Sequence, residues 1–135
     1  MSKFILPIYG IVKPTKNNKN CAITLNWSRA AHYRDYGKAK KMFKLLMNNQ
    51  FRKSGKFEGQ IKINYVYYAK KKGTDLDNFV GMARKFFQDA LSEYGLIEDD
   101  NTNIIIASSE SYGGIDKENP RVEAEVITIN EFNLK

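Results

Sequence analysis

Hydrophobic positions near the start of the chain predict a strand. Residues 4–12 are mostly apolar and rich in branched and aromatic side chains, a composition that favours extended backbone. Pro7 interrupts this run, and a proline inside a strand indicates an edge position or a bulge. Residues 13–20 are polar and contain several asparagines, so we expect a loop there. A second short extended piece is expected over residues 21–27.

The period of the pattern changes at Ser28. Apolar residues then recur at steps of three and four, which is the spacing of an amphipathic helix. We expect this helix to end near Asn49 and to carry its basic residues largely on another face. The apolar positions are Ala31, Tyr36, Ala39, Met42, Phe43, Leu46 and Met47, and the basic positions are Arg34, Lys38, Lys41 and Lys44.

Strict alternation returns at residues 60–69. In QIKINYVYYA every second side chain, beginning with Ile61, is apolar or aromatic, which is the two-residue period of a strand. This strand leads directly toward Asp75.

A second and clearer helical stripe covers residues 78–94. Gly95 supplies a stop for this helix, and Asp77 or Asn78 stands where its amino-terminal cap is expected. The remaining segments are an acidic turn at residues 98–101, a strand at 103–108, a glycine loop at 111–120 and a final alternating strand at 121–129.

The predicted order of elements is strand, helix, strand, helix, strand, strand. This order indicates an α+β fold in which two main helices cover a small mixed sheet. The chain has 135 residues and no repeat or Pro/Gly/Ser linker, so we expect residues 1–135 to form a single domain.

Charge divides the chain into two unlike halves. Residues 1–72 contain 17 Lys and Arg against 2 acids, whereas residues 73–135 contain 5 Lys and Arg against 13 acids. A basic half of this density is typical of proteins that bind nucleic acid or an anionic membrane, although it is also compatible with a merely solvated surface. The acidic half would repel DNA unless a cation were bound among its carboxylates.

Cysteine and histidine are too scarce for a disulfide framework or a closed zinc site. The chain has one cysteine, Cys21, and one histidine, His32, so we expect a reducing compartment. No apolar run reaches the roughly 20 residues that a membrane span needs. We therefore expect a soluble, cytoplasmic protein that does not insert into a membrane.

Two carboxylates follow directly behind a run of lysines. Asp75 and Asp77 come after Lys70, Lys71 and Lys72. In extended chain, side chains two positions apart point to the same side at about 7 Å spacing, so this pair can share a divalent ion. Hard cations of the magnesium class take several oxygen ligands, and the acidic turn is expected to supply a third. The alternative is that these acids only cap a helix and shape a turn.

Three motifs in this region resemble those of one enzyme family. The runs DLDN, KFFQDAL and GLIEDDN are similar to the signature of the RusA-type Holliday junction resolvases, small magnesium-dependent endonucleases of phages and prophages. The resemblance is specific over residues 70–104 and only general elsewhere. It implies that Asp75, Asp77 and Asp100 are catalytic metal ligands for Mg²⁺ or Mn²⁺, with Asp99 as a stand-in for Asp100.

The chain departs from the family pattern at one position. Many members place a lysine four residues beyond the second aspartate, where this chain has Gly81. Aligning instead on the downstream Lys-x-x-x-Asp-Ala-Leu assigns the catalytic role to Lys85, which on a helix is turned by about 40° and raised by about 6 Å from Gly81. Arg84 is the rival for this contact with the scissile phosphate.

The resemblance also implies a substrate and a partner. Family members act as homodimers on four-way DNA junctions, whose two-fold symmetry requires two matched nicks. Lys70, Lys71 and Lys72 would guide the DNA backbone, and Arg34 and Lys38 would extend that surface. Aromatic residues on basic segments are candidates for stacking at the opened crossover, with core packing as the alternative for Tyr36; these are Trp27, Tyr33 and Tyr36.

These observations predict a magnesium-dependent, structure-selective DNA endonuclease that resolves four-way junctions by paired symmetric nicks. Two alternatives remain. One is a nuclease of broader specificity acting on flaps and forks. The other is a non-catalytic nucleic-acid-binding protein.

Overall fold

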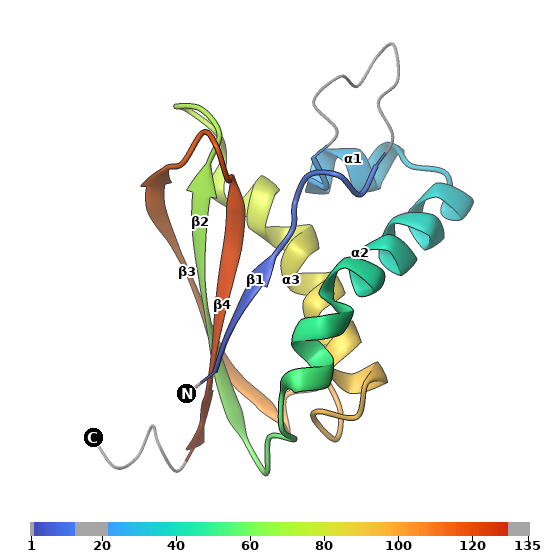
Figure 1. Ribbon diagram of the computed structural model, residues 1–135, viewed down its shortest axis with the longest axis vertical. Helices are drawn as coiled ribbons and strands as arrows, with labels where there is room; N and C mark the ends of the chain where they lie inside the picture. Colours follow the sequence, from blue (N-terminus) through green and yellow to red (C-terminus); the bar gives the residue numbers. More distant parts are fainter. Residues whose placement is uncertain (1, 13–21, 130–135) are drawn as a thin grey trace.

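The computed structural model describes residues 2–12 and 22–129 (Figure 1). The predicted loop over residues 13–20 and the final residues from 130 onward lie outside this part. The elements are β1 (Ser2–Leu6), α1 (Leu25–Ala30), α2 (Tyr33–Lys53), β2 (Ile61–Ala69), α3 (Leu76–Glu93), β3 (Ile105–Ile115) and β4 (Arg121–Thr128).

The four strands form one mixed sheet in the order β1-β4-β2-β3. Strands β2 and β3 are parallel, while β4 is antiparallel to both β1 and β2. Parallel neighbours need a crossover connection, and α3 provides it between β2 and β3. Helix α3 therefore runs opposite in direction to the two strands that it joins. The predicted α+β fold class is confirmed.

The helices cover one face of the sheet and leave the other face open (Figure 1). Strand β2 shows this division most clearly, because its residues alternate between buried and half-buried along the whole strand. Helix α3 lies over β2, where the ring of Phe79 stacks on Tyr67 at 5.3 Å and that of Phe87 meets Tyr65 at 6.3 Å. The Tyr65 hydroxyl is satisfied by Gln88 of α3, whose side-chain amide donates to it at 3.0 Å. This packing fixes the position of α3 on the sheet.

Helix α2 packs beside α3 through its own apolar stripe. Phe43 of α2 contacts Phe86 of α3 with ring centroids 5.7 Å apart, and Phe51 stacks on Phe87 at 6.0 Å. Among the described residues no polar or charged side chain is fully buried. The core is therefore apolar and aromatic, as the three- and four-residue spacing of both stripes predicts.

The amino-terminal region differs from the sequence-based prediction. Strand β1 ends at Leu6, immediately before Pro7, and it is an edge strand as the proline indicates. The extended piece expected over residues 21–27 is wrong from Leu25 on, where α1 begins, and Cys21 lies outside the described residues. The reason is local: the hydroxyl of Thr24 accepts from the backbone N–H of Trp27 at 3.0 Å and so caps a short helix.

Strand β3 is longer than predicted. The segment expected to be a glycine loop, residues 111–120, contributes its first half to the strand, which reaches Ile115. Pairing with β2 holds this segment extended, with a register shift between Tyr67 and Tyr68 that absorbs an extra residue. A side chain at Gly113 would meet the ring of Tyr68 at 2.7 Å, so glycine here permits close strand contact.

None of the helices in the described part of the chain is both long and apolar enough to cross a membrane.

Candidate metal and nucleic-acid site

The first two predicted ligands lie at the amino end of α3. Asp75 is the amino-terminal cap of this helix, and its Oδ1 accepts from the backbone N–H of Asn78 at 3.1 Å. The prediction that Asp77 or Asn78 is the cap is therefore wrong by two or three positions. The cap residue Asp75 keeps extended backbone, whereas Asp77 already lies in the first turn of the helix. The two carboxylates therefore stand at the junction between the loop and α3.

Asp77 is the carboxylate at this end that has no structural task. It is exposed in the first turn of α3, and within residues 2–12 and 22–129 it has no hydrogen-bond or ion-pair partner. The positive end of the helix dipole favours a carboxylate at this position. A free, exposed carboxylate beside a capping one leaves oxygen atoms available to a cation.

The surroundings of this end are held rigidly. The Asn78 side-chain oxygen accepts from the backbone N–H of Asn26 at 3.0 Å and so ties the start of α1 to the start of α3. The Tyr67 hydroxyl bonds that of Thr74 at 2.9 Å, which anchors the loop before the helix to β2. The asparagine of the DLDN motif thus has a positioning role that the sequence did not reveal.

Gly81 lies where α1 packs closely onto α3. A Cβ atom at Gly81 would lie 2.8 Å from the side chain of Leu25, far inside normal contact. Helix α1 packs onto α3 at this point, so any larger residue would push α1 away. A glycine at this position is therefore a packing requirement of this chain.

Asp100 lies at the opposite end of α3. It follows the carboxyl end of that helix and contacts Asp89, one turn before the helix ends. The pKa of Asp100 is raised above its usual 3.8. The largest cause is hydrogen bonding to Asp89, followed by partial burial and by hydrogen bonding to Asp99. Asp89 belongs to the KFFQDAL motif, yet the motif gave no sign of this contact.

Asp99 has a structural task within the turn. Its carboxylate accepts from the backbone N–H of Asp100 at 2.7 Å and from the side-chain amide of Asn101 at 3.0 Å. These bonds make Asp99 the residue that shapes the turn, in the manner of an Asx turn. Asp100 is left as the carboxylate of this turn that faces α3.

A single chain does not bring the three predicted ligands together. Asp77 and Asp89 are twelve residues apart on one helix, a separation of about 18 Å at 1.5 Å per residue. Asp100 stays beside Asp89 and is thus remote from Asp75 and Asp77. Within the described residues, no three side chains of aspartate, glutamate, histidine or cysteine are grouped to hold one ion. The expectation that both ends of the helix meet within one chain is wrong.

The two candidate cations on α3 have different partners. Lys85 is 59% exposed in its side chain and lies 3.7 Å from the carboxylate of Asp89. Arg84 forms an ion pair with Glu110 of β3. Lys85 is therefore the freer charge, and it lies nearer to the Asp89 and Asp100 end than to Asp77.

Predicted DNA-contacting residues cluster in two places. Lys70, Lys71 and Lys72 are exposed in the loop between β2 and α3, and we call them the lysine loop. The ammonium group of Lys70 lies 5.2 Å from the ring of Tyr9. Arg34 and Lys38 are exposed in the first turns of α2. The lysine loop directly precedes Asp75, so positive and negative groups adjoin at the amino end of α3.

The three aromatic candidates for base stacking differ in exposure. Trp27 and Tyr36 stack on each other at 6.2 Å, and Tyr36 also packs against Phe86 of the core. Tyr33 is 73% exposed and lies against His32, with ring centroids 4.4 Å apart. Of the three, Tyr33 is the one that is accessible to a ligand.

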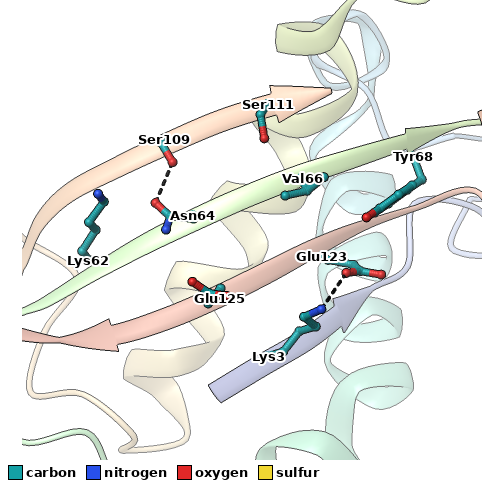
Figure 2. Close-up of a pocket in the computed structure, with 9 residues that line it drawn as sticks. All are labelled: Lys3, Lys62, Asn64, Val66, Tyr68, Ser109, Ser111, Glu123 and Glu125. Carbon is teal, nitrogen blue, oxygen red and sulfur yellow. Dashed lines mark hydrogen bonds and ion pairs between the residues drawn. The ribbon is translucent and has the colours of Figure 1, made fainter. Parts of the chain in front are cut away.

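Two of the hollows on the surface of the described residues bear on the predicted site. One, of about 360 Å³, lies between α3 and the start of β3 and is lined by Arg84, Gln88 and Asp100 among others. The other, of about 490 Å³, lies on the open face of the sheet. Figure 2 shows that two pairs of its polar groups face each other, with Lys3 toward Glu123 at 3.3 Å and Asn64 toward Ser109. Only the first hollow contains a predicted site residue.

No protein-family model and no curated protein matches this chain.

Proposed function

We propose that this chain is a metal-dependent, structure-selective DNA endonuclease of the RusA type that resolves four-way junctions as a homodimer. The observation that carries the proposal is the distribution of acids along α3. A free carboxylate, Asp77, stands at one end behind the lysine loop, and two adjoining carboxylates, Asp89 and Asp100, stand at the other.

Two copies of the chain would complete what one copy lacks. A two-fold axis that passes beside the middle of α3 places the two copies of this helix antiparallel, so that the amino end of each lies toward the carboxyl end of the other. Asp75 and Asp77 of one copy would then adjoin Asp100 of the second copy, and the same contact would occur twice. Two such sites related by a two-fold axis suit a substrate that must be nicked at two symmetric positions.

The residues of this chain would divide the work as follows. The three carboxylates would supply oxygen ligands of the kind that Mg²⁺ or Mn²⁺ prefers. A bound ion of this kind polarises a phosphodiester and activates water for attack. The lysine loop would hold the DNA backbone, with Arg34 and Lys38 extending the basic surface. Lys85 would stabilise the charge that develops on the phosphate, for which a compact ammonium is suited.

Cleavage of a synthetic four-way junction in Mg²⁺, beside matched duplex and forked DNA, tests the proposal. We expect paired symmetric nicks that are confined to the junction. Asp77→Asn should lower cleavage by about 100-fold or more while junction binding is retained or strengthened, because the lost charge holds the ion but repels phosphate. Glu125→Gln removes one charge from the open face of the sheet and is the matched control, with activity like that of wild type.

Other outcomes have distinct meanings. Equal cleavage of all three substrates would exclude a resolvase and leave a nuclease of broader specificity. Unchanged cleavage by Asp77→Asn would contradict the proposed site.

The second candidate function is non-catalytic nucleic-acid binding. Two of the acids have structural roles that favour this function without any metal, since Asp75 caps a helix and Asp99 shapes a turn. A protein of this kind would bind junctions equally with and without Mg²⁺ and would cut none of them.

A further inference from the structure

The two edge strands of the sheet, β1 and β3, differ in whether their outer backbone groups are hydrogen-bonded. At the β1 edge, the side-chain amide of Gln50 bonds the backbone of Ile5 twice, accepting from its N–H at 2.7 Å and donating to its carbonyl at 2.8 Å. A side chain of α2 therefore occupies the strand groups that a further strand would use. At the other edge, β3 has β2 on one side and no strand of the described chain on the other (Figure 1).

Strand β3 lacks the lysines and prolines that often protect a free edge, and its two register shifts against β2 lie near its ends. Its sequence, IIASSESYGGI, contains no lysine and no proline over 11 residues. Its single charged residue, Glu110, is already paired with Arg84 of α3. Between these shifts, residues 107–112 present a regular row of backbone donors and acceptors to another strand.

Exposed apolar side chains accompany this free edge. Ile106 is 41% exposed, Tyr112 is 55% exposed and Ile115 is 49% exposed, and all three belong to β3. The isoleucines stand near the two ends of the strand. Antiparallel pairing of two copies about Glu110 would place Ile106 of each copy opposite Gly114 of the other and next to Ile115, so the exposed isoleucines of the two strands would adjoin.

We propose that the free edge of β3 is the surface through which two copies of this chain pair, with their β3 strands antiparallel and their sheets continuous. The inference rests on the proposed function for its choice of occupant, since the divided acids call for a second copy. Helix α3 lies on β2 and runs opposite to β3. A two-fold axis at the β3 edge thus places the two α3 helices antiparallel on the same face of the joined sheet.

The exposed apolar residues of α2 are a weaker candidate for this contact. Met42, Leu45 and Leu46 are exposed, but a helix offers no unpaired backbone groups along its length. Lysines also alternate with these residues along the helix. The β3 edge combines apolar contact with backbone hydrogen bonding, which the α2 surface lacks.

Sedimentation equilibrium of the full chain tests the inference. We expect wild type to be a dimer and Ile106→Lys to raise the dimer dissociation constant by about tenfold or more, because a charged side chain on an edge opposes strand pairing. Ile115→Lys is the second variant and should act in the same direction. Ile5→Lys places the same change on the exposed part of the β1 edge and should leave the dimer intact. Circular dichroism confirms that each variant is folded.

The inference and the proposed function fail in different ways. Dimers of Ile106→Lys and Ile115→Lys that are as tight as wild type, or a wild type that stays monomeric into the submillimolar range, would overturn the β3 interface even if junction cleavage is found. Dissociation of both variants would support the interface, and if wild type then cut no DNA in Mg²⁺ or Mn²⁺, only the proposed function would fail.

Discussion

At the scale of single residues, four aspartates around α3 have four different surroundings. Asp75 is bound by a backbone N–H as a cap, and Asp99 is bound twice within its turn. Asp77 has no partner in the described part of the chain, whereas Asp100 lies against another carboxylate. A bound cation would stabilise Asp77 and Asp100 most, because Asp77 is free and Asp100 is repelled by the neighbouring carboxylate of Asp89.

The contact between Asp89 and Asp100 predicts a pH-dependent stability. A carboxyl whose pKa is raised by folding stabilises the protein in its protonated form, below the usual pKa of 3.8, and this contribution is lost as the pH rises through the raised pKa. At pH 7, Asp100→Asn should therefore raise the free energy of unfolding by a few tenths of a kcal/mol, roughly the scale of exposed charge pairs. Urea unfolding at neutral pH and at pH values below 3.8 measures the difference, which should disappear in acid.

A double substitution is the control for this effect. In an Asp89→Asn background the repulsion from Asp89 is already removed, so Asp100→Asn should bring a smaller gain, because only partial burial and Asp99 still raise the pKa of Asp100. An equal gain in both backgrounds would show that Asp89 is not its source.

At the scale of elements, the contact between α1 and α3 depends on Gly81. Alanine at this position would gain about 1 kcal/mol of helix propensity, but its Cβ would lie 2.8 Å from the Leu25 side chain. Overpacking of this kind costs about 1–3 kcal/mol, so we expect Gly81→Ala to lower the free energy of unfolding by on the order of 1 kcal/mol. Urea unfolding provides the measurement, and faster amide exchange over Leu25–Ala30 should accompany it.

Removing the obstructing side chain should reverse the sign. In a Leu25→Ala background, Gly81→Ala should become stabilising, because only the helix-propensity term remains. A stabilising Gly81→Ala in the wild-type background would contradict the account of this contact.

The elements that the sequence predicts well are those with a long and regular period. The stripe of α3 and the alternation of β2 each give their element to within a few residues. By contrast, α1 depends on one capping hydroxyl and on packing against Gly81, and the second half of β3 depends on its partner strand. Contacts between distant segments decide these elements, and no local period records them.

For the candidate site, too, the sequence pattern does not show which distant residues lie together in the folded chain. The spacing of DLDN and the acidic turn identifies carboxylates at both ends of one helix, but the length of that helix decides whether they meet. At 18 residues, α3 is too long for its two ends to share an ion within one chain. Asn78, Asp89 and Glu110 were not predicted as site residues because their roles arise only from contacts in the folded chain.

At the scale of the whole molecule, the proposed metal site needs a second copy of the chain. In the proposed dimer, one copy would contribute the free carboxylate and the lysine loop, and the second would contribute Asp100 with its neighbour Asp89. Antiparallel pairing of two copies through the open β3 edge would place their two α3 helices antiparallel. The two-fold symmetry of such a dimer matches that of a four-way junction.

The most direct test of this claim is complementation between two inactive variants. Asp77→Asn and Asp100→Asn are each expected to bind junctions without cutting them. In a heterodimer of the two, a site shared between copies combines both substitutions in one site and leaves the other site intact. After subunit exchange the mixture should recover about one quarter of the wild-type nicking sites. A mixture that remains as inactive as either variant alone, although the subunits exchange and bind the junction, would contradict the shared site.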